Sequence, residues 1–319
     1  MGGCLPLFDN GLGFYEAKIS KISRAEDAAA PSPYARKNGK PYAQRPGLEK
    51  VVRGFPGGLL PPPTTKTDHG DRTVLNKAQT QFQSTLTDAR KSALQKYRDT
   101  VVGREDLLSL VRYEVITSLL GDLPGALGFF LRQIFYPFLF AEVGQGVVFG
   151  RHLTLRHPYK IKIGHRVVID DYCLLDAKGC REGDFTLGNN VLISRNCILS
   201  CKEGFLKVGD NTNFGANCSV YSVGCMDIGA NVLFAANCYL GGSMYHFDRT
   251  DIPPIQQGSY SKGGVTIGEG CWLGADVKIL DGVRLGQGVI VGSGAVVLED
   301  VEPFSIVAGV PAKLIRKRA

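Results

Sequence analysis

The chain has 319 residues, of which 40 are glycine and 44% are apolar. This length allows a large buried core, and the composition suits a turn-rich globular or repeat protein better than a disordered one. Residues 1–100 carry 16 Lys and Arg against 9 Asp and Glu, whereas residues 101–319 carry 21 of each. The net charge of +7 therefore belongs to the first part of the chain, and the neutral remainder gives no charge argument for nucleic-acid binding. We expect no nucleic-acid partner.

The chain contains nine cysteines, an odd number, and no CxxC pair. No hydrophobic signal segment stands at the N-terminus. These features favour a reduced, cytoplasmic protein.

Two segments precede the main pattern. Residues 1–85 are rich in Pro, Gly and basic residues, as in "AAAPSPYARKNGKPYAQRPG", and are predicted to be a disordered tail. Residues 86–142 have helical periodicity. Within "REDLLSLVRYEVITSLLGDLPG" the residues Leu108, Val111, Val115 and Leu119 form one apolar stripe, and "GDLPG" ends the helix.

The apolar run "ALGFFLRQIFYPFLF" is interrupted by Arg132 and Pro137 and is too short for a confident membrane span. Two interpretations remain open. The segment is either a cap that covers the open end of the next domain or an interfacial segment that contacts a membrane surface.

From residue 143 to residue 319 an apolar residue recurs at every sixth position, and Gly follows more than half of these anchors. A helix cannot keep every sixth residue on one side, and a single long strand has no reason for Gly at this spacing. Three short strands per 18-residue coil satisfy both observations and predict a β-solenoid. The eighteen anchors are Ile163, Ile169, Leu175, Leu187, Ile193, Leu199, Val208, Phe214, Val220, Ile228, Phe234, Leu240, Ile267, Leu273, Ile279, Leu285, Val291 and Val297.

The coils start at 163, 187, 208, 228, 267 and 285, so their lengths exceed 18 residues by 6, 3, 2, 21 and 0. Every insertion follows the third strand of a coil and must leave from the same corner of the prism. The largest is the loop 241–263. Long ordered loops on rigid scaffolds are usually functional.

A column of cysteines lies four residues after successive anchors. Side chains stacked at ladder spacing form neither a zinc tetrahedron nor a series of relaxed disulfides, so we interpret them as small buried apolar residues. The column consists of Cys173, Cys197, Cys218 and Cys238, which belong to the second strand of consecutive coils, and Cys271 has the same spacing after a first-strand anchor.

The chain's five histidines are His69, His152, His157, His165 and His246. His152 and His157 have a spacing that would suit zinc if a third histidine joined them, although a surface or cap position explains them more simply. His246 stands on the long loop beside Tyr245, Asp248 and Asp251, and a histidine there is a candidate general base or a residue in a local hydrogen bond.

The stretch "HFDRTDIPPIQQGSYSKGGVTIGEGCWLGADVKILDGVRLGQGVIVGSGAVVLEDVEPFSIVAGVPAKLIRK" resembles the hexapeptide-repeat acyltransferases, and most of all their sugar and polysaccharide O-acetyltransferase branch. The resemblance covers roughly 147–317. It implies a left-handed parallel β-helix, a mainly β fold, and a homotrimer with acetyl-CoA bound between neighbouring prisms and no metal.

The family's catalytic histidine matches His246, which implies general-base catalysis of direct acetyl transfer to a hydroxyl group. Asp248 or Asp251 is a candidate for orienting its imidazole. The family's CoA contacts match Ala275 and Ser293, with Trp272 packing beside the site and Lys313 near the CoA phosphates.

Two positions depart from the family's pattern. The chain has Leu298, Glu299 and Asp300 where relatives often have Thr-Lys-Asp, so a positive charge is lost beside CoA, and the C-terminal residues 316–318 are candidates to replace it. The corner that often carries an acidic acceptor contact reads "VYSVGC", with Ser222 and no carboxylate. This favours a polysaccharide, lipopolysaccharide or lipid-linked acceptor over a small free sugar, with peripheral contact at the inner face of the membrane.

Two other functional classes remain open. A zinc lyase resembling the gamma-class carbonic anhydrases has the same prism but needs three converging histidines. A non-catalytic β-helix scaffold needs neither His246 nor the long loop.

Overall fold

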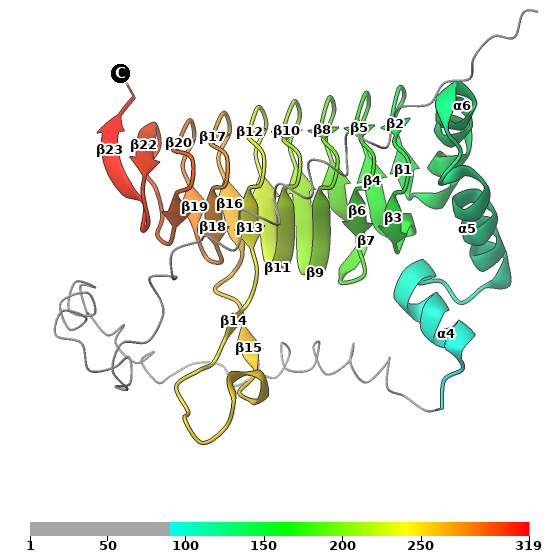
Figure 1. Ribbon diagram of the computed structural model, residues 1–319, viewed down its shortest axis with the longest axis horizontal. Helices are drawn as coiled ribbons and strands as arrows, with labels where there is room; N and C mark the ends of the chain where they lie inside the picture. Colours follow the sequence, from blue (N-terminus) through cyan, green and yellow to red (C-terminus); the bar gives the residue numbers. More distant parts are fainter. Residues whose placement is uncertain (1–89, 319) are drawn as a thin grey trace, which may run out of the picture. The chain divides into compact units, whose positions relative to one another are not determined.

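The computed structural model describes residues 90–318, which lie within one compact unit of the chain (Figure 1). The tail predicted over residues 1–85 lies outside the described residues. Short helices come first and are followed by a long parallel β-helix.

Each coil of the β-helix contributes three short strands, as the six-residue period predicts. Strands in the same place of successive coils pair in parallel, as Asn213–Phe214 do with Leu233–Phe234. The first strands are β4 (Ile161–Ile163), the ends of β7 (Cys180–Leu187), β9 (Ile198–Val208) and β11 (Ser219–Ile228), then β16 (Val265–Ile267) and β19 (Arg284–Leu285). The second strands are β5 (Val168–Ile169), β8 (Leu192–Ile193), β10 (Asn213–Phe214), β12 (Leu233–Phe234), β17 (Trp272–Leu273) and β20 (Ile290–Val291). The third strands are β6 (Leu174–Asp176), the starts of β9 and β11, β13 (Tyr239–Gly241), β18 (Lys278–Leu280) and β21 (Val296–Val297).

One coil precedes the first predicted one, and a hairpin closes the far end. The early coil consists of β1 (Glu142–Val143), β2 (Val148–Phe149) and β3 (Thr154–Arg156), followed by the short 3-10 helix η4 (Pro158–Lys160). The last strands, β22 (Ser305–Ala308) and β23 (Lys313–Lys317), pair antiparallel, so the end of the chain folds back over the last coil.

All eighteen anchors are buried, with exposed fractions of 3% or less. Stacked anchors touch directly: the rings of Phe214 and Phe234 lie 4.6 Å apart and almost parallel. Because each inward side chain rests on its equivalents in the neighbouring coils, the core is continuous along the prism. The prediction of a parallel β-solenoid is confirmed.

The small insertions form strand rather than loops. β9 and β11 each run from the third strand of one coil into the first strand of the next, and they pair along nearly their whole length with a bulge at Ser222–Val223. Only the largest insertion leaves the wall, and it carries the short strands β14 (Met244–Tyr245) and β15 (Ser259–Tyr260). In Figure 1 it projects from the prism below β13.

The predicted cysteine column is buried and unbridged. Its members lie in the turns just after the strands, and each thiol donates to a carbonyl of the next coil, as Cys197 does to Gly215 at 3.2 Å. The expectation of a fully reduced chain is wrong at another pair, because Cys180 and Cys201 form a disulfide across β7 and β9. No spacing in the sequence indicated this pair, because both cysteines lie in the strand extensions where the six-residue period is broken.

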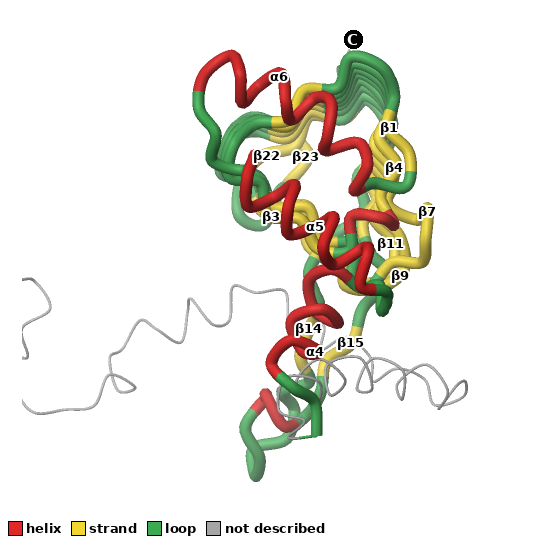
Figure 2. Tube along the Cα trace, turned by 90° about the vertical axis from the view of Figure 1, so that its right-hand side faces the viewer, coloured by secondary structure: helices red, strands yellow, loops and turns green. Residues whose placement is uncertain are grey.

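Helices cover the first coil (Figure 2). They are α4 (Ala93–Tyr97), the π-helical turn η2 (Arg98–Val102), α5 (Leu107–Leu120), α6 (Gly125–Phe135) and the 3-10 turn η3 (Tyr136–Leu139). Tyr136 packs on Phe149 at a ring distance of 5.4 Å, and Tyr113 donates a hydrogen bond to the carbonyl of Leu155. The buried side chains of the helices therefore join those of the first coil in one continuous hydrophobic core.

Arg132, which interrupts the apolar run in the sequence, is 3% exposed. Its guanidinium donates to the carbonyls of Leu120, Leu123 and Phe149, and so ties both helices to β2. Burial lowers the pKa of this side chain. The charge is held by carbonyl oxygens at a helix end, where four carbonyls lack helical partners.

The predicted apolar stripe of α5 faces away from the core. Leu108 is 76% exposed and Leu119 is 67% exposed, whereas Leu110, Tyr113 and Ile116 form the buried side of the helix. On α6 and η3, Leu127, Phe130 and Phe138 are exposed as well. None of the helices within residues 90–318 is long and apolar enough to cross a membrane.

His157 is buried against the helices, so its protonation can be used to test the contact between the helices and the first coil. Its Nε2 atom donates to the carbonyl of Asp99, and Nδ1 has no partner within residues 90–318. Burial, together with nearby Lys160, lowers the pKa of His157 from its ordinary 6.5 to about 4.

We expect the free energy of unfolding to fall as the pH drops from 6.5 to about 4, because only the unfolded chain then takes up a proton at His157. The loss is about 3 kcal/mol at most. His157→Gln keeps a donor for Asp99 but does not titrate, so urea denaturation at several pH values should show a flatter profile for the variant. Identical pH profiles for the two proteins would contradict this assignment.

Candidate active site

The long loop is an organised hairpin with His246 at the end of its stem. β14 and β15 pair antiparallel, with Met244 opposite Tyr260. The backbone N–H of His246 donates to the carbonyl of Gly258 at 3.0 Å, which adds one further rung. The backbone of His246 is therefore fixed by the hairpin.

The imidazole of His246 stacks on the ring of Tyr260, with the ring centroids 4.6 Å apart and the planes inclined by 29°. Within residues 90–318, no hydrogen bond of either imidazole nitrogen is present. The ring is thus held by its face while both nitrogens remain able to exchange a proton with a substrate.

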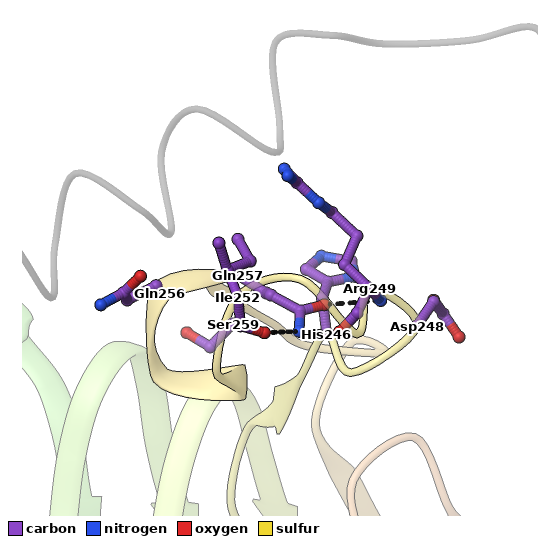
Figure 3. A pocket seen from close by; sticks show the side chains of 7 residues that line it. All are labelled: His246, Asp248, Arg249, Ile252, Gln256, Gln257 and Ser259. Atoms are coloured by element: carbon purple, nitrogen blue, oxygen red, sulfur yellow. Dashed lines mark hydrogen bonds between the residues drawn. The ribbon is translucent and has the colours of Figure 1, made fainter.

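The tip of the loop is ordered by its own side chains (Figure 3). Arg249 forms an ion pair with Asp251, and the side chain of Gln257 bonds the backbone of Arg249 and the carbonyl of Ile252. Asp251 is therefore engaged by Arg249 rather than by His246, and this arginine lowers the pKa of Asp251. Asp248 is exposed and points away from the imidazole in Figure 3.

A shallow hollow of about 390 Å³ opens beside His246. Among residues 90–318 only the loop lines it, and one side is open. Its lining residues are His246, Asp248, Arg249, Ile252, Gln256, Gln257 and Ser259. Such a hollow holds part of a substrate and needs a second wall to enclose it.

The residues expected to contact CoA lie at another corner of the prism. Ala275 follows β17 and Ser293 follows β20, whereas the His246 loop follows β13. Ala275 and Ser293 occupy the same turn of neighbouring coils, because the N–H of Gly294 donates to the carbonyl of Ala275 at 2.7 Å. Within one chain, Ala275 and Ser293 therefore lie close together, and His246 lies at a different corner.

Trp272 and Lys313 are exposed. Trp272 stands outward on β17, 50% exposed, between Leu233 and Ile290 of the adjacent coils. Lys313 begins β23, opposite Ala308. Of the C-terminal cations, Lys317 donates to the carbonyl of Pro303 and Arg318 to that of Gly288.

The other histidines have separate partners. The Nδ1 atom of His152 lies 2.8 Å from a carboxylate oxygen of Asp122 and its ring stacks on Tyr172, and the Nδ1 atom of His165 accepts from the N–H of Gln145. Within the described part of the chain, no three His, Cys, Asp or Glu side chains gather as a metal site would require. The zinc-lyase alternative therefore gains no support from these residues.

Ser222, at the corner where some relatives carry an acidic residue, is fully buried and donates to the carbonyl of Phe205. Burial raises the pKa of the Cys271 thiol, which keeps it protonated and unreactive. Tyr260, which stacks on His246, and Asp281, which binds the foot of the loop, were not among the predicted site residues. Asp281 is the one with a readable signal, since it is a carboxylate placed just after a buried strand.

Two family models match the solenoid. A model described as bacterial transferase hexapeptide (six repeats) matches residues 264–299, and one described as hexapeptide repeat of succinyl-transferase matches residues 206–242. Both matches fall on the coils that define the six-residue period.

Three relatives extend these matches. A protein of Mycobacterium tuberculosis named as an acetyltransferase is 33% identical over 41% of this chain and 44% of its own length. WbbJ of Escherichia coli, named as a lipopolysaccharide biosynthesis O-acetyl transferase, is 32% identical over 43% of this chain and 73% of its own length. The dTDP-4-amino-4,6-dideoxy-D-glucose acyltransferase of Escherichia coli is 29% identical over 49% of this chain and 82% of its own length.

The chain belongs to the hexapeptide-repeat acyltransferase family. The parallel β-helix that the resemblance implied is confirmed. The chain spans less than half of the mycobacterial relative and about three quarters of WbbJ.

Proposed function

We propose that the protein is an acetyl-CoA-dependent O-acetyltransferase that acts on a saccharide. The observation that carries this proposal is the imidazole of His246, which is fixed by a hairpin and a stacked tyrosine in an open hollow and whose two nitrogens have no hydrogen bond within residues 90–318. Membership of the acyltransferase family supports it, and so do relatives named as acetyltransferases.

In the proposed reaction His246 takes the proton of an acceptor hydroxyl as its oxygen attacks the thioester carbonyl of acetyl-CoA. A tetrahedral intermediate forms, and its collapse breaks the C–S bond. The leaving thiolate takes the proton back from the imidazolium, so the products are the acetyl ester and free CoA. Tyr260 keeps the imidazole plane fixed through both transfers.

We further propose that the active unit is a homotrimer. The His246 loop and the turns of Ala275 and Ser293 leave different corners of one prism, and within the described part of the chain the hollow beside His246 is lined on the loop side only. A neighbouring copy would supply that wall with its own Ala275, Ser293, Trp272 and Lys313. Acetyl-CoA would then lie in the cleft between two copies.

The acceptor proposed is a polysaccharide, a lipopolysaccharide or a lipid-linked sugar. Ser222 is buried and is not a carboxylate, unlike the acidic residue that the resemblance led us to expect for a small free sugar, and the hollow beside His246 is open at one side. WbbJ is named for lipopolysaccharide biosynthesis and O-acetyl transfer, which supports a hydroxyl acceptor of this kind.

We propose that the protein contacts an anionic membrane surface through the exposed apolar residues of α5 and α6. Residues 90–112, which enter these helices, carry six Lys and Arg against three Asp and Glu. Exposed leucine and phenylalanine next to excess positive charge is the combination that binds an anionic bilayer surface. This contact would hold the enzyme beside a lipid-linked acceptor.

Replacing His246 tests the proposed base. With acetyl-CoA and a saccharide and glycolipid fraction from the host, His246→Ala should lower acceptor-dependent thiol release by about 10²-fold or more. The oligomer and CoA affinity should stay unchanged. His165→Ala, an exposed histidine on a distant turn, is the control and should keep the full rate. Equal rates for wild type and His246→Ala would refute the assignment.

Replacing Lys313 tests the proposed CoA site. Lys313→Ala should raise the KM for acetyl-CoA by about 10-fold with kcat nearly constant, because the lost ion pair acts equally on the ground state and the transition state. Lys207→Ala, another exposed lysine, is the matched control. A fall in kcat at unchanged KM would speak against a phosphate contact.

The membrane contact can be tested by co-sedimentation with vesicles of phosphatidylglycerol and phosphatidylcholine, roughly one to three. Binding should be lost for Leu108→Ser with Phe130→Ser, because each change removes exposed apolar area. Leu233→Ser with Ile255→Ser changes exposed apolar residues outside α5 and α6, one on β12 and one in the short 3-10 helix η5 (Pro254–Gln256), and should bind as wild type does. Undiminished binding by the first pair would exclude this face.

A further inference from the structure

Asp281 lies at the foot of the His246 loop and is 6% exposed. It follows β18, on the wall of the prism, and its carboxylate accepts three hydrogen bonds from the returning arm of the loop. The donors are the hydroxyl of Ser261 at 3.1 Å, the backbone N–H of Lys262, and the backbone N–H of Gly264 at 2.9 Å.

The same turn is closed by two further bonds. The N–H of Gly282 donates to the carbonyl of Gly264 at 2.7 Å, and the N–H of Gly263 donates to the hydroxyl oxygen of Ser261 at 3.0 Å. Gly264 has a φ of 94°, a conformation that places its N–H towards the carboxylate and that other residues rarely adopt. The carboxylate is thus the centre of a satisfied network, which rigidifies the chain around it.

This network adjoins the residue that holds the imidazole. Ser261 directly follows Tyr260, whose ring stacks on His246 and whose backbone pairs with Met244. The path from the wall to the proposed base is therefore Asp281, Ser261, Tyr260 and His246. In the next coil the equivalent position is Glu299, which is exposed. The repeat itself therefore does not bury a carboxylate at this position, and Asp281 is buried where the loop arm binds it.

We infer that Asp281 is a positioning residue for His246, fixing the returning arm of the loop so that Tyr260 holds the imidazole at the reacting atoms. This inference rests on the proposed function of His246. A displacement of about 1 Å at a catalytic group can lower a rate by about 10²-fold. Loss of the clamp at the foot of the loop is therefore expected to lower the rate by displacing His246.

Asp281→Asn tests this clamp. The variant keeps the size of the side chain, but one acceptor oxygen becomes an NH2 donor that faces the N–H and O–H donors of the returning arm. The kcat for thiol release from acetyl-CoA with the host saccharide and glycolipid fraction should fall about 10-fold or more, with the KM for acetyl-CoA within about threefold. Hydrogen exchange at the amides of Lys262 and Gly264 should become about 10-fold faster or more. Asp176→Asn is the matched control, because Asp176 is also a buried carboxylate but lies on a distant coil.

A double-mutant cycle separates positioning from general stability. In a His246→Ala background, Asp281→Asn should have no further effect on kcat if it acts through His246. The same fold-loss in both backgrounds, unchanged exchange at Lys262 and Gly264, or a kcat equal to that of Asp176→Asn would each overturn the inference.

Failure of the proposed function gives a different result. If His246→Ala itself keeps the full rate, the assignment of the base fails and Asp281 has no base to position, whatever the exchange shows. If Asp281→Asn does not fold, Ser261→Ala removes one of the three bonds and should give the same pattern with a smaller loss of kcat. Unaltered kcat and exchange in that variant would overturn the clamp.

Discussion

Inward stacking of one apolar side chain every six residues is the constraint on which the rest of this structure depends. A single coil cannot bury its own anchors, and its backbone groups need partners in the coils above and below. The stack therefore has two open ends. The helices with Arg132 and Tyr136 cover one end, and the β22–β23 hairpin covers the other.

The same constraint decides where chemistry can be placed. Residues added within a strand would put the anchors out of register, so additional residues collect at the corner after the third strand. Small additions continue as strand in β7, β9 and β11, because their neighbours offer unpaired edges. The large addition has no such neighbour beyond its stem and projects as the hairpin that carries His246.

A loop that leaves a rigid wall must be tied back to it to position a catalytic group. The wall contributes the carboxylate of Asp281, and the loop contributes the hydroxyl and amides that bind it. His246 itself contacts its own hairpin, through the carbonyl of Gly258 and the ring of Tyr260. The proposed base is thus placed by the loop and anchored by the solenoid, and the proposed second wall of the site belongs to another copy.

The six-residue period was sufficient to predict the solenoid, all eighteen anchors, the corner of every insertion and the buried cysteine column, because a linear repeat expresses stacking that recurs at a constant interval. The sequence also indicated a functional role for His246, because a long loop that adds nothing to the buried core is usually functional. Contacts between distant segments were not visible: the stacking of Tyr260, the clamp of Asp281, the Cys180–Cys201 pair and the outward direction of the α5 stripe. Each of these features depends on contacts between segments outside the six-residue repeat. Such contacts have no fixed spacing in the sequence, so only the tertiary structure determines them.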